Sequence, residues 1–188
     1  MGWFVAFIFM FFLIYFVSTI MEENKDKEIK TNDLKNSIKL LEHIIEIQKN
    51  TPQNPSSTIG RLDINISNDE VSLQEPSHKQ EFVLKAVGTL YLHHDEFNFL
   101  STTQTRNIKL SNIIKTDLFT NGLRLYLKNR QRPITFTNLD SPTAFYHLFK
   151  LFDEMNRKYS TFQWEDAEYF ISELSLVVKE LKNKLNKS

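Results

Sequence analysis

The chain has 188 residues, 41% of them apolar, which is enough for one packed domain with accessory helices. Lysine plus arginine and aspartate plus glutamate balance at 23 each, so no overall positive field draws the protein to nucleic acid. Cysteine is absent, which excludes disulfides, thiolate nucleophiles and cysteine-ligated zinc or iron–sulfur centres.

The N-terminus is an apolar run. No charged residue occurs from Trp3 to Val17, and a helix extended to Ile20 would be about 27 Å long, close to the hydrocarbon thickness of a bilayer. No Lys or Arg precedes Trp3, and the run ends in VSTI followed by charged residues, which favours an uncleaved anchor over a secretory signal. We therefore expect residues 1–21 to form a transmembrane anchor.

Lysines flank this run on its C-terminal side only. They are Lys25, Lys27, Lys30, Lys35 and Lys39. Because Lys-rich flanks stay on the cytoplasmic side, we expect a single-pass protein of the cell membrane with its C-terminal domain in the cytoplasm.

A second helix is predicted for residues 22–50. Neither Pro nor Gly occurs there, and apolar residues recur at steps of 4, 3 and 4. These residues are Leu34, Ile38, Leu41 and Ile45. The two prolines and the polar residues of NTPQNPSST then predict a linker at 51–60.

From Arg61 to Phe136 the pattern changes to the alternation of β-strands. The runs are RLDINIS, EFVLKA, GTLYLHH, EFNFLS, RNIKLS, NIIKTDLF, GLRLYLK and PITFTN. Asn121-Gly122 indicates a tight hairpin, since both residues tolerate positive φ. The whole predicts a meandering antiparallel sheet.

Two amphipathic helices are predicted after the sheet. Ser141-Pro142 suits the start of the first, whose apolar stripe is Phe145, Leu148, Phe149, Phe152 and Met155. The second, residues 162–188, has a heptad seam made of Ala167, Ile171, Leu174, Val178, Leu181 and Leu185. We expect this seam to pair with the 22–50 helix, within one chain or across a dimer. The alternative is that both helices cover the sheet.

The succession of a GTLYL strand, a tight turn, an FNF strand, RNIKLSNI, NGLRLYL, PITF and a closing helix resembles the GRAM and bacterial pleckstrin-homology-like (PH-like) domains. The resemblance spans roughly Glu81 to Lys158, and we place the domain at 61–158. It implies an α+β fold, with about seven strands in a bent antiparallel β-sandwich or barrel capped by a C-terminal helix. The transmembrane helix and two long amphipathic helices would flank this domain.

In pleckstrin-type relatives, the resemblance implies a phosphoinositide held by basic residues around the first hairpin. Here EFVL and GTLYL, taken as the two strands of that hairpin, are joined only by Lys85-Ala86-Val87. This connection leaves no room for a multidentate headgroup site.

The predicted binding surface is basic. Its residues are Arg124, Lys128, Arg130 and Arg132, which suit an acidic partner, phosphate or acidic lipid. The alternative is a solvated loop that keeps the sheet edge soluble.

His93-His94-Asp95-Glu96 is interpreted as a polar hairpin tip and not as a metal site, because neighbouring strand residues point to opposite faces. No phosphate loop, nucleophile elbow or HExxH motif occurs. We therefore expect no catalytic residue, no metal and no cofactor, and a protein that is not an enzyme.

The predicted function is that of a membrane-tethered interaction module, an adaptor or scaffold that concentrates a protein partner at the membrane or self-associates. One alternative is a phage- or immunity-type protein that acts through its transmembrane span. Another is a sensor of anionic lipid, and a small enzyme is the least favoured. Nucleic acid is not an expected partner.

Overall fold

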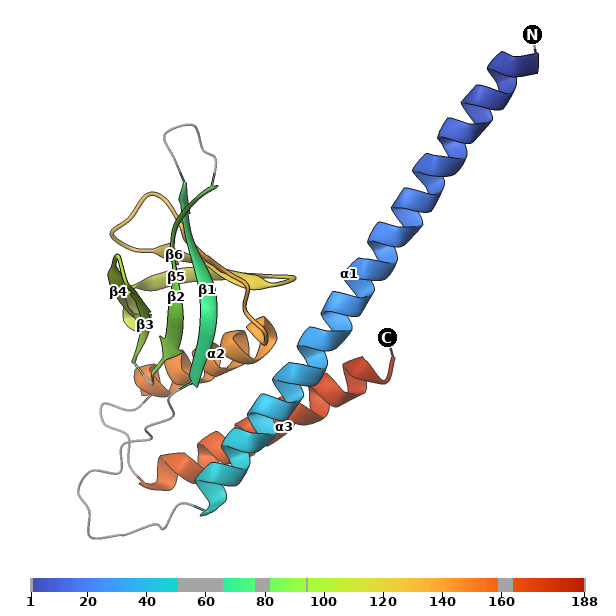
Figure 1. The fold of residues 1–188 in the computed structure, drawn as a ribbon. Coiled ribbons are helices and arrows are strands. Elements are labelled where there is room, and N and C mark those ends of the chain that lie inside the picture. The colour runs from blue at the N-terminus through green and yellow to red at the C-terminus, as the bar shows by residue number, and fades with distance from the viewer. Residues whose placement is uncertain (1, 51–65, 77–81, 94, 159–163, 188) are drawn as a thin grey trace.

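The computed structural model describes residues 2–50, 66–76, 82–93, 95–158 and 164–187 (Figure 1). Its helices are α1 (Gly2–Asn50), α2 (Pro142–Lys158) and α3 (Trp164–Leu185), with a short 3-10 turn η1 (Leu110–Asn112). Its strands are β1 (Ile66–Pro76), β2 (Phe82–Leu92), β3 (Glu96–Ser101), β4 (Thr105–Lys109), β5 (Ile113–Phe119), β6 (Gly122–Leu127) and β7 (Ile134–Thr137). The chain is therefore α+β, as the alternation and the helical stripes predict.

The strands form one seven-stranded antiparallel sheet in the order β4-β3-β2-β1-β7-β6-β5. Two meanders, β1 to β4 and β5 to β7, are joined where β1 pairs with β7. The sheet curls, so that β5 and β6 cross the direction of β1 and β2, and α2 lies beneath it (Figure 1). This half-barrel closed by a helix agrees with the bent sandwich that the resemblance implies.

The core lies between the curled sheet and α2. All five residues of the predicted stripe on α2 are buried. Phe149 places its ring 5.9 Å from that of Phe97 on β3, and Phe99 packs against Phe136 at 5.8 Å. Aromatic rings from both meanders thus fill the interior, and their burial is the main force that holds the sheet closed.

The hairpin predicted at Asn121-Gly122 is present, but for a different reason. Phe119 pairs with Gly122 across a two-residue turn, and neither turn residue nor Gly122 has a positive φ. Glycine is required by space, because a Cβ at position 122 would lie 2.1 Å from the carbonyl oxygen of Phe136. The close approach of β6 to β7 selects this residue.

Two strand predictions differ from the structure. The first strand was predicted at Arg61 to Ser67, and its last two residues belong to β1, while residues 61–65 lie outside the described part. β1 continues to Pro76 and buries Val71 and Leu73 in a stretch for which no strand was predicted. EFVLKA and GTLYLHH were taken as two strands, yet β2 is continuous from Phe82 to Leu92. Lys85 to Val87 therefore lie inside a strand and are not a turn.

Helix α1 is continuous from Gly2 to Asn50. Over the residues for which the structure gives positions, no helix has an apolar stretch long enough to cross a bilayer, so the transmembrane helix predicted for residues 1–21 finds no support there. The side chains of residues 2–18 and 20, on which that prediction depends, are outside the described set. The predicted linker at 51–60 is also outside it.

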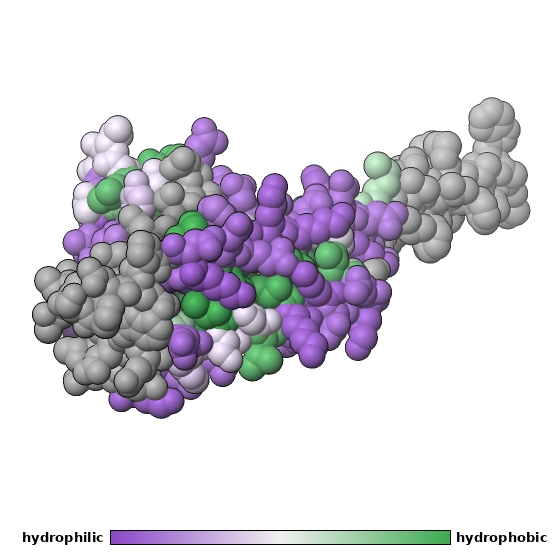
Figure 2. All heavy atoms as spheres, turned by 90° about the horizontal axis from the view of Figure 1, so that it is seen from below, coloured by the Kyte–Doolittle hydropathy of each residue, from purple (hydrophilic) through white to green (hydrophobic). Residues whose placement is uncertain are grey.

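Helices α1 and α3 lie side by side and antiparallel within one chain (Figure 1). Leu41 and Ile44 of α1 share a buried cluster with the seam residues of α3, and Lys182 Nζ lies 2.7 Å from Glu42 Oε1. Of the predicted seam, Leu174, Val178 and Leu181 are buried, while Ala167, Ile171 and Leu185 are partly buried. Seen from below, mainly hydrophilic side chains surround a short hydrophobic band (Figure 2).

Candidate functional site

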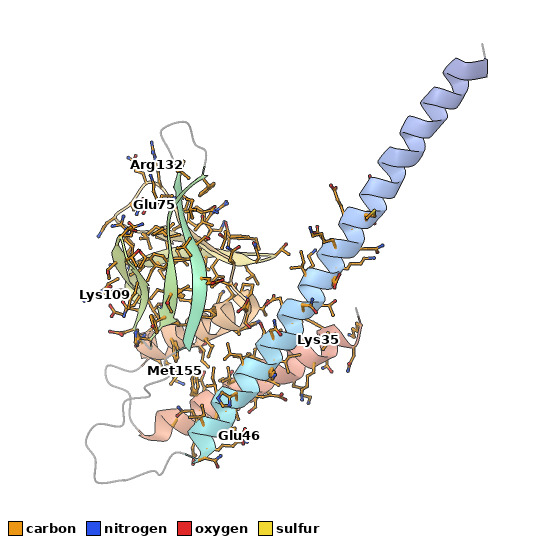
Figure 3. All side chains as sticks on the ribbon, viewed as in Figure 1. Lys35, Glu46, Glu75, Lys109, Arg132 and Met155 are labelled. Carbon is orange, nitrogen blue, oxygen red and sulfur yellow. The ribbon has the colours of Figure 1, made fainter. Side chains whose placement is uncertain are left out.

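A cluster of charged side chains surrounds Glu75, at the end of β1. Its carboxylate, 12% exposed, lies 3.0 Å from Arg130 Nη2 and 3.3 Å from Arg106 Nη2. Arg132 Nη1 donates to the carbonyl oxygen of Pro76 at 3.3 Å. We call Glu75, Lys85, Arg106, Arg130 and Arg132 the basic end of the sheet. In Figure 3 Glu75 and Arg132 lie at the end of the sheet remote from Met155 on α2.

The electrostatics of the basic end keep Glu75 ionised. Burial alone would raise the pKa of its carboxyl, but the hydrogen bond and charge of Arg130, with the charges of Arg106 and Lys85, outweigh burial and lower the pKa. Three cationic side chains therefore act on one carboxylate, and a fourth, Arg132, is bound to the carbonyl oxygen of the next residue, Pro76. The surplus of positive charge suits an acidic ligand.

The predicted basic residues do not form one cluster. Arg130 and Arg132 belong to the basic end. Arg124 instead donates from Nε to Thr135 Oγ1 at 3.4 Å, and its guanidinium lies 4.5 Å from the ring centre of Phe82. Lys128 is exposed just after β6. Arg124 thus has a cation–π contact that covers an apolar ring.

The sequence did not reveal Glu75, Lys85 and Arg106 as members of the site. Strand β4, which carries Arg106, is three strands away from β1 in the sheet order, and the curl alone brings Arg106 to Glu75. No spacing along the chain encodes that contact.

The argument against a headgroup site was also wrong, because it placed the first hairpin at Lys85-Ala86-Val87. The first hairpin joins β1 to β2 through residues 77–81, which lie outside the described part. Pro76 and Phe82 pair at its base. This hairpin begins at the basic end.

His93, the first of the two adjacent histidines, lies at the turn between β2 and β3. His93 N donates to the Glu96 carbonyl oxygen at 2.8 Å, and the Asp95 carbonyl accepts from Leu110 N at 2.8 Å. His94 is outside the described residues. In the described ranges, no group of three or more His, Cys, Asp or Glu is placed to hold a metal ion.

A polar joint connects α1 to the start of α2. Asp33 accepts from Thr143 N at 3.3 Å and from Thr143 Oγ1 at 2.5 Å. Ser37 Oγ accepts from Ala144 N at 3.0 Å and donates to Asp33 Oδ1 at 3.0 Å. We call these four residues the Asp33 clamp. They satisfy backbone N–H groups that the first turn of a helix leaves free, and the carboxylate lies at the positive end of the helix dipole.

Comparison with known proteins identifies no family: no protein-family model and no curated protein matches the chain. Among solved structures, the C-terminal domain of an unknown protein from Leishmania infantum is 13% identical, with a TM-score of 0.32, over 44% of this chain and 80% of that one. The N-terminal PH domain of human ARAP2 is 14% identical, with a TM-score of 0.27, over 66% and 87%.

At those TM-scores the two alignments carry no argument. The fold class therefore follows from the architecture, which is a curled seven-stranded antiparallel sheet followed by a helix that closes it. This architecture fits a PH-like fold. Neither comparison identifies a GRAM family, so that part of the resemblance stays a prediction.

Proposed function

We propose that the chain is a PH-like interaction module, tethered to a membrane by its N-terminal run, that binds an acidic ligand at the basic end of the sheet. The observation that carries the proposal is the gathering of Lys85, Arg106 and Arg130 around Glu75, with Arg132 bound to the adjacent Pro76 carbonyl oxygen. Glu75 holds two of the guanidinium groups in place, so a ligand meets positions that are already fixed and loses less entropy on binding.

The tether is supported by the uncharged run from Trp3 to Val17 and by the lysines that follow it. Tethering keeps the module and its ligand at one surface, which raises their effective concentration. The test is extraction of membranes with alkaline carbonate. The full chain should stay in the membrane pellet and a chain lacking residues 1–21 should not. Equal extraction of both would refute the tether.

Ligand binding is tested with charge reversal in the full chain. Arg130→Glu with Arg132→Glu should abolish capture of the acidic partner. The matched control is Lys109→Glu with Lys150→Glu, two exposed lysines outside the basic end, which should leave capture unchanged. The same partners bound by both variants would exclude the basic end as the binding surface.

Anionic lipid of the same membrane is the second candidate ligand. It is favoured because the N-terminal end of α1 and the basic end, where Glu75 and Arg132 are labelled, lie on the same side of α2 and α3 (Figures 1 and 3). The full chain in nanodiscs containing phosphatidylserine should then protect the β1 and β2 amides from hydrogen exchange, less so at high salt. Equal protection in neutral nanodiscs would leave the acidic protein partner as the ligand.

Replacing residues 1–21 with an unrelated anchor separates tethering from a membrane-active role. If residues 1–21 serve only as a tether, the protein should keep its activity with the unrelated anchor. Loss of activity after the exchange would favour the alternative in which the span itself acts.

A further inference from the structure

Strand β5 is an edge of the sheet. Within the described ranges it pairs with β6 and with no other strand. In an antiparallel edge strand every second residue directs its N–H and C=O groups outward, so β5 presents unfilled backbone hydrogen-bonding groups. Two of its apolar side chains are unusually exposed, Ile114 at 66% and Leu118 at 40%.

The sequence of this edge is complementary to itself. It reads Ile114-Lys115-Thr116-Asp117-Leu118. When two copies run antiparallel with Thr116 opposite Thr116, each Lys115 faces the other copy's Asp117. Each Ile114 comes near the other copy's Leu118, although Ile114 itself lies at the register shift between Ile113 and Lys115, where β5 is irregular. Opposite charges, apolar pairs and Thr–Thr pairs are the cross-strand combinations that stabilise a sheet.

The other edge strand lacks this property. In β4, an antiparallel pair centred on Asn107 would place Arg106 opposite Ile108 and Thr105 opposite Lys109. A charge would face an apolar side chain on that edge. The self-complementary pattern is therefore a feature of β5 and not a general result of strand alternation.

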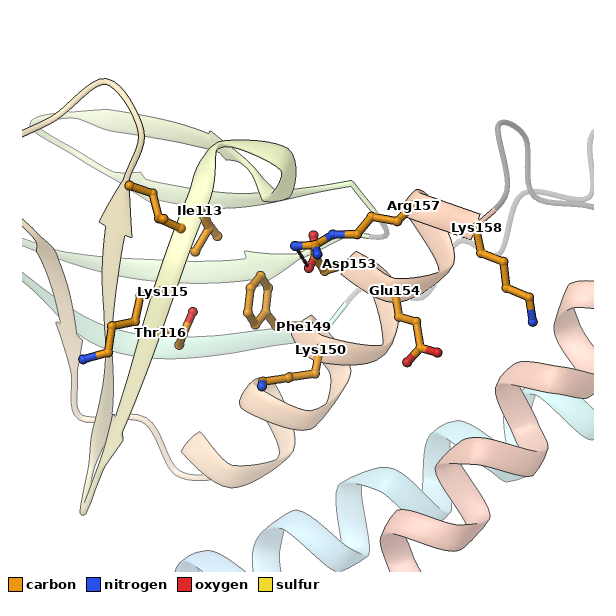
Figure 4. Close-up of a pocket in the computed structure, with 10 residues that line it drawn as sticks. Ile113, Lys115, Thr116, Phe149, Lys150, Asp153, Glu154, Arg157 and Lys158 are labelled. Carbon is orange, nitrogen blue, oxygen red and sulfur yellow. Dashed lines mark ion pairs between the residues drawn. The ribbon is translucent and has the colours of Figure 1, made fainter.

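A groove lies beside β5. It has a volume of about 650 Å³ and lies between β5 and α2, with Thr116 and Phe149 directed into it and Lys115 pointing away (Figure 4). Thr116 Oγ1 is buried, with no hydrogen-bond partner among the described residues. On the outward face Asp117 Oδ1 lies 2.8 Å from Lys115 Nζ, and Asp117 Oδ2 accepts from Tyr126 Oη at 3.0 Å.

We propose that β5 is a dimerisation edge, at which a second copy of this chain adds its own β5 antiparallel with Thr116 on the two-fold axis. The pairing is isologous, so it closes after two copies and hides both edges. Copies anchored in one membrane would meet at raised concentration. The inference goes beyond the proposed function, because it does not depend on the ligand at the basic end.

The register is tested by disulfide formation, since the natural chain has no cysteine. Thr116→Cys in the full chain, oxidised in its membrane, should form a covalent dimer, because paired residues of antiparallel strands have Cα atoms about 4.5–5.5 Å apart, within disulfide reach. The matched control is Asn107→Cys on the exposed edge β4, which should stay monomeric. Equal crosslinking of both variants, or none at position 116, would overturn the proposal.

Charge exchange tests the pairing without cysteine. Lys115→Asp alone, or Asp117→Lys alone, places like charges opposite each other twice and should weaken the dimer by about tenfold or more. A mixture of the two single variants restores both attractive pairs in a heterodimer, and so does the double variant with itself. Both side chains are on the surface, 64% and 36% exposed, so the fold should survive, which a melting curve checks.

Dimers of wild-type strength in each single variant, or no recovery in the mixture, would refute this register. Crosslinking of the Thr116→Cys variant only to other proteins of the membrane would assign the edge to a different occupant and would also overturn the proposal.

Discussion

Replacing Asp33 is expected to loosen the attachment of α1 to the sheet domain. In Asp33→Ala the Thr143 N–H and hydroxyl lose their acceptor, and Ser37 loses the acceptor of its own hydroxyl. Thr143 is 7% exposed and Ser37 is fully buried, so water replaces these bonds poorly. A lost N-cap costs about 0.5–2 kcal/mol and a charge at a helix N-terminus contributes about 0.3–1 kcal/mol, so we expect a loss of about 1–3 kcal/mol.

The assay is urea unfolding of the full chain in detergent micelles, combined with hydrogen exchange at Thr143 and Ala144. Exchange at these two amides should accelerate more than exchange in β2 or β3, because the clamp acts on the first turn of α2. The control is Asp26→Ala, an exposed residue of the same helix, which should change stability by less than about 0.5 kcal/mol. Asp33→Ala within about 0.5 kcal/mol of wild type would refute the reasoning.

Three further predictions concern the sheet and α3. Gly122→Ala should cost about 2–3 kcal/mol in urea unfolding, because its Cβ would meet the Phe136 carbonyl oxygen; an unchanged midpoint would contradict this close approach. Glu75→Gln should lower stability at pH 7. Since the native pKa of Glu75 lies below its ordinary 4.5, the wild type loses this contribution as the pH falls below that value, and the two melting curves should converge in acid. Phe170→Ala should cost about 3–5 kcal/mol, because this buried ring stacks on Phe152 at 5.5 Å; a loss under about 1 kcal/mol would mean that α3 packs elsewhere.

The sequence predicted those elements whose pattern is local. The stripe on α2 and the strands from EFNFLS to PITFTN follow from periods of 3.6 and 2, and each lies where its pattern indicates. Most of strand β1 was not predicted because NDEVSLQEP has only Val71 and Leu73 as apolar core residues among charged and polar neighbours. The sequence pattern divided β2 into two predicted strands because its first four residues, Phe82 to Lys85, are exposed and the next residue, Ala86, is small.

The contacts between elements could not be predicted in the same way. Nothing in residues 22–50 shows that Asp33 and Ser37 bind the helix that begins at Pro142. The basic end could not be predicted either, because Arg106 reaches Glu75 only through the curl of the sheet. Long-range polar contacts have no period, so one sequence does not reveal them.

The unbroken helix α1 makes the orientation of the sheet domain a matter of helical phase. Asp33 is twelve residues after Met21, about 18 Å along the axis at 1.5 Å per residue. One alanine inserted between them would turn the domain by about 100° around the N-terminal part of α1 while advancing it only about 1.5 Å. Four would turn it by about 400°, so that it would stand about 40° past its starting azimuth and about 6 Å further along the axis. The length of α1 thus sets both the direction in which the basic end faces and its distance from the N-terminal part of α1.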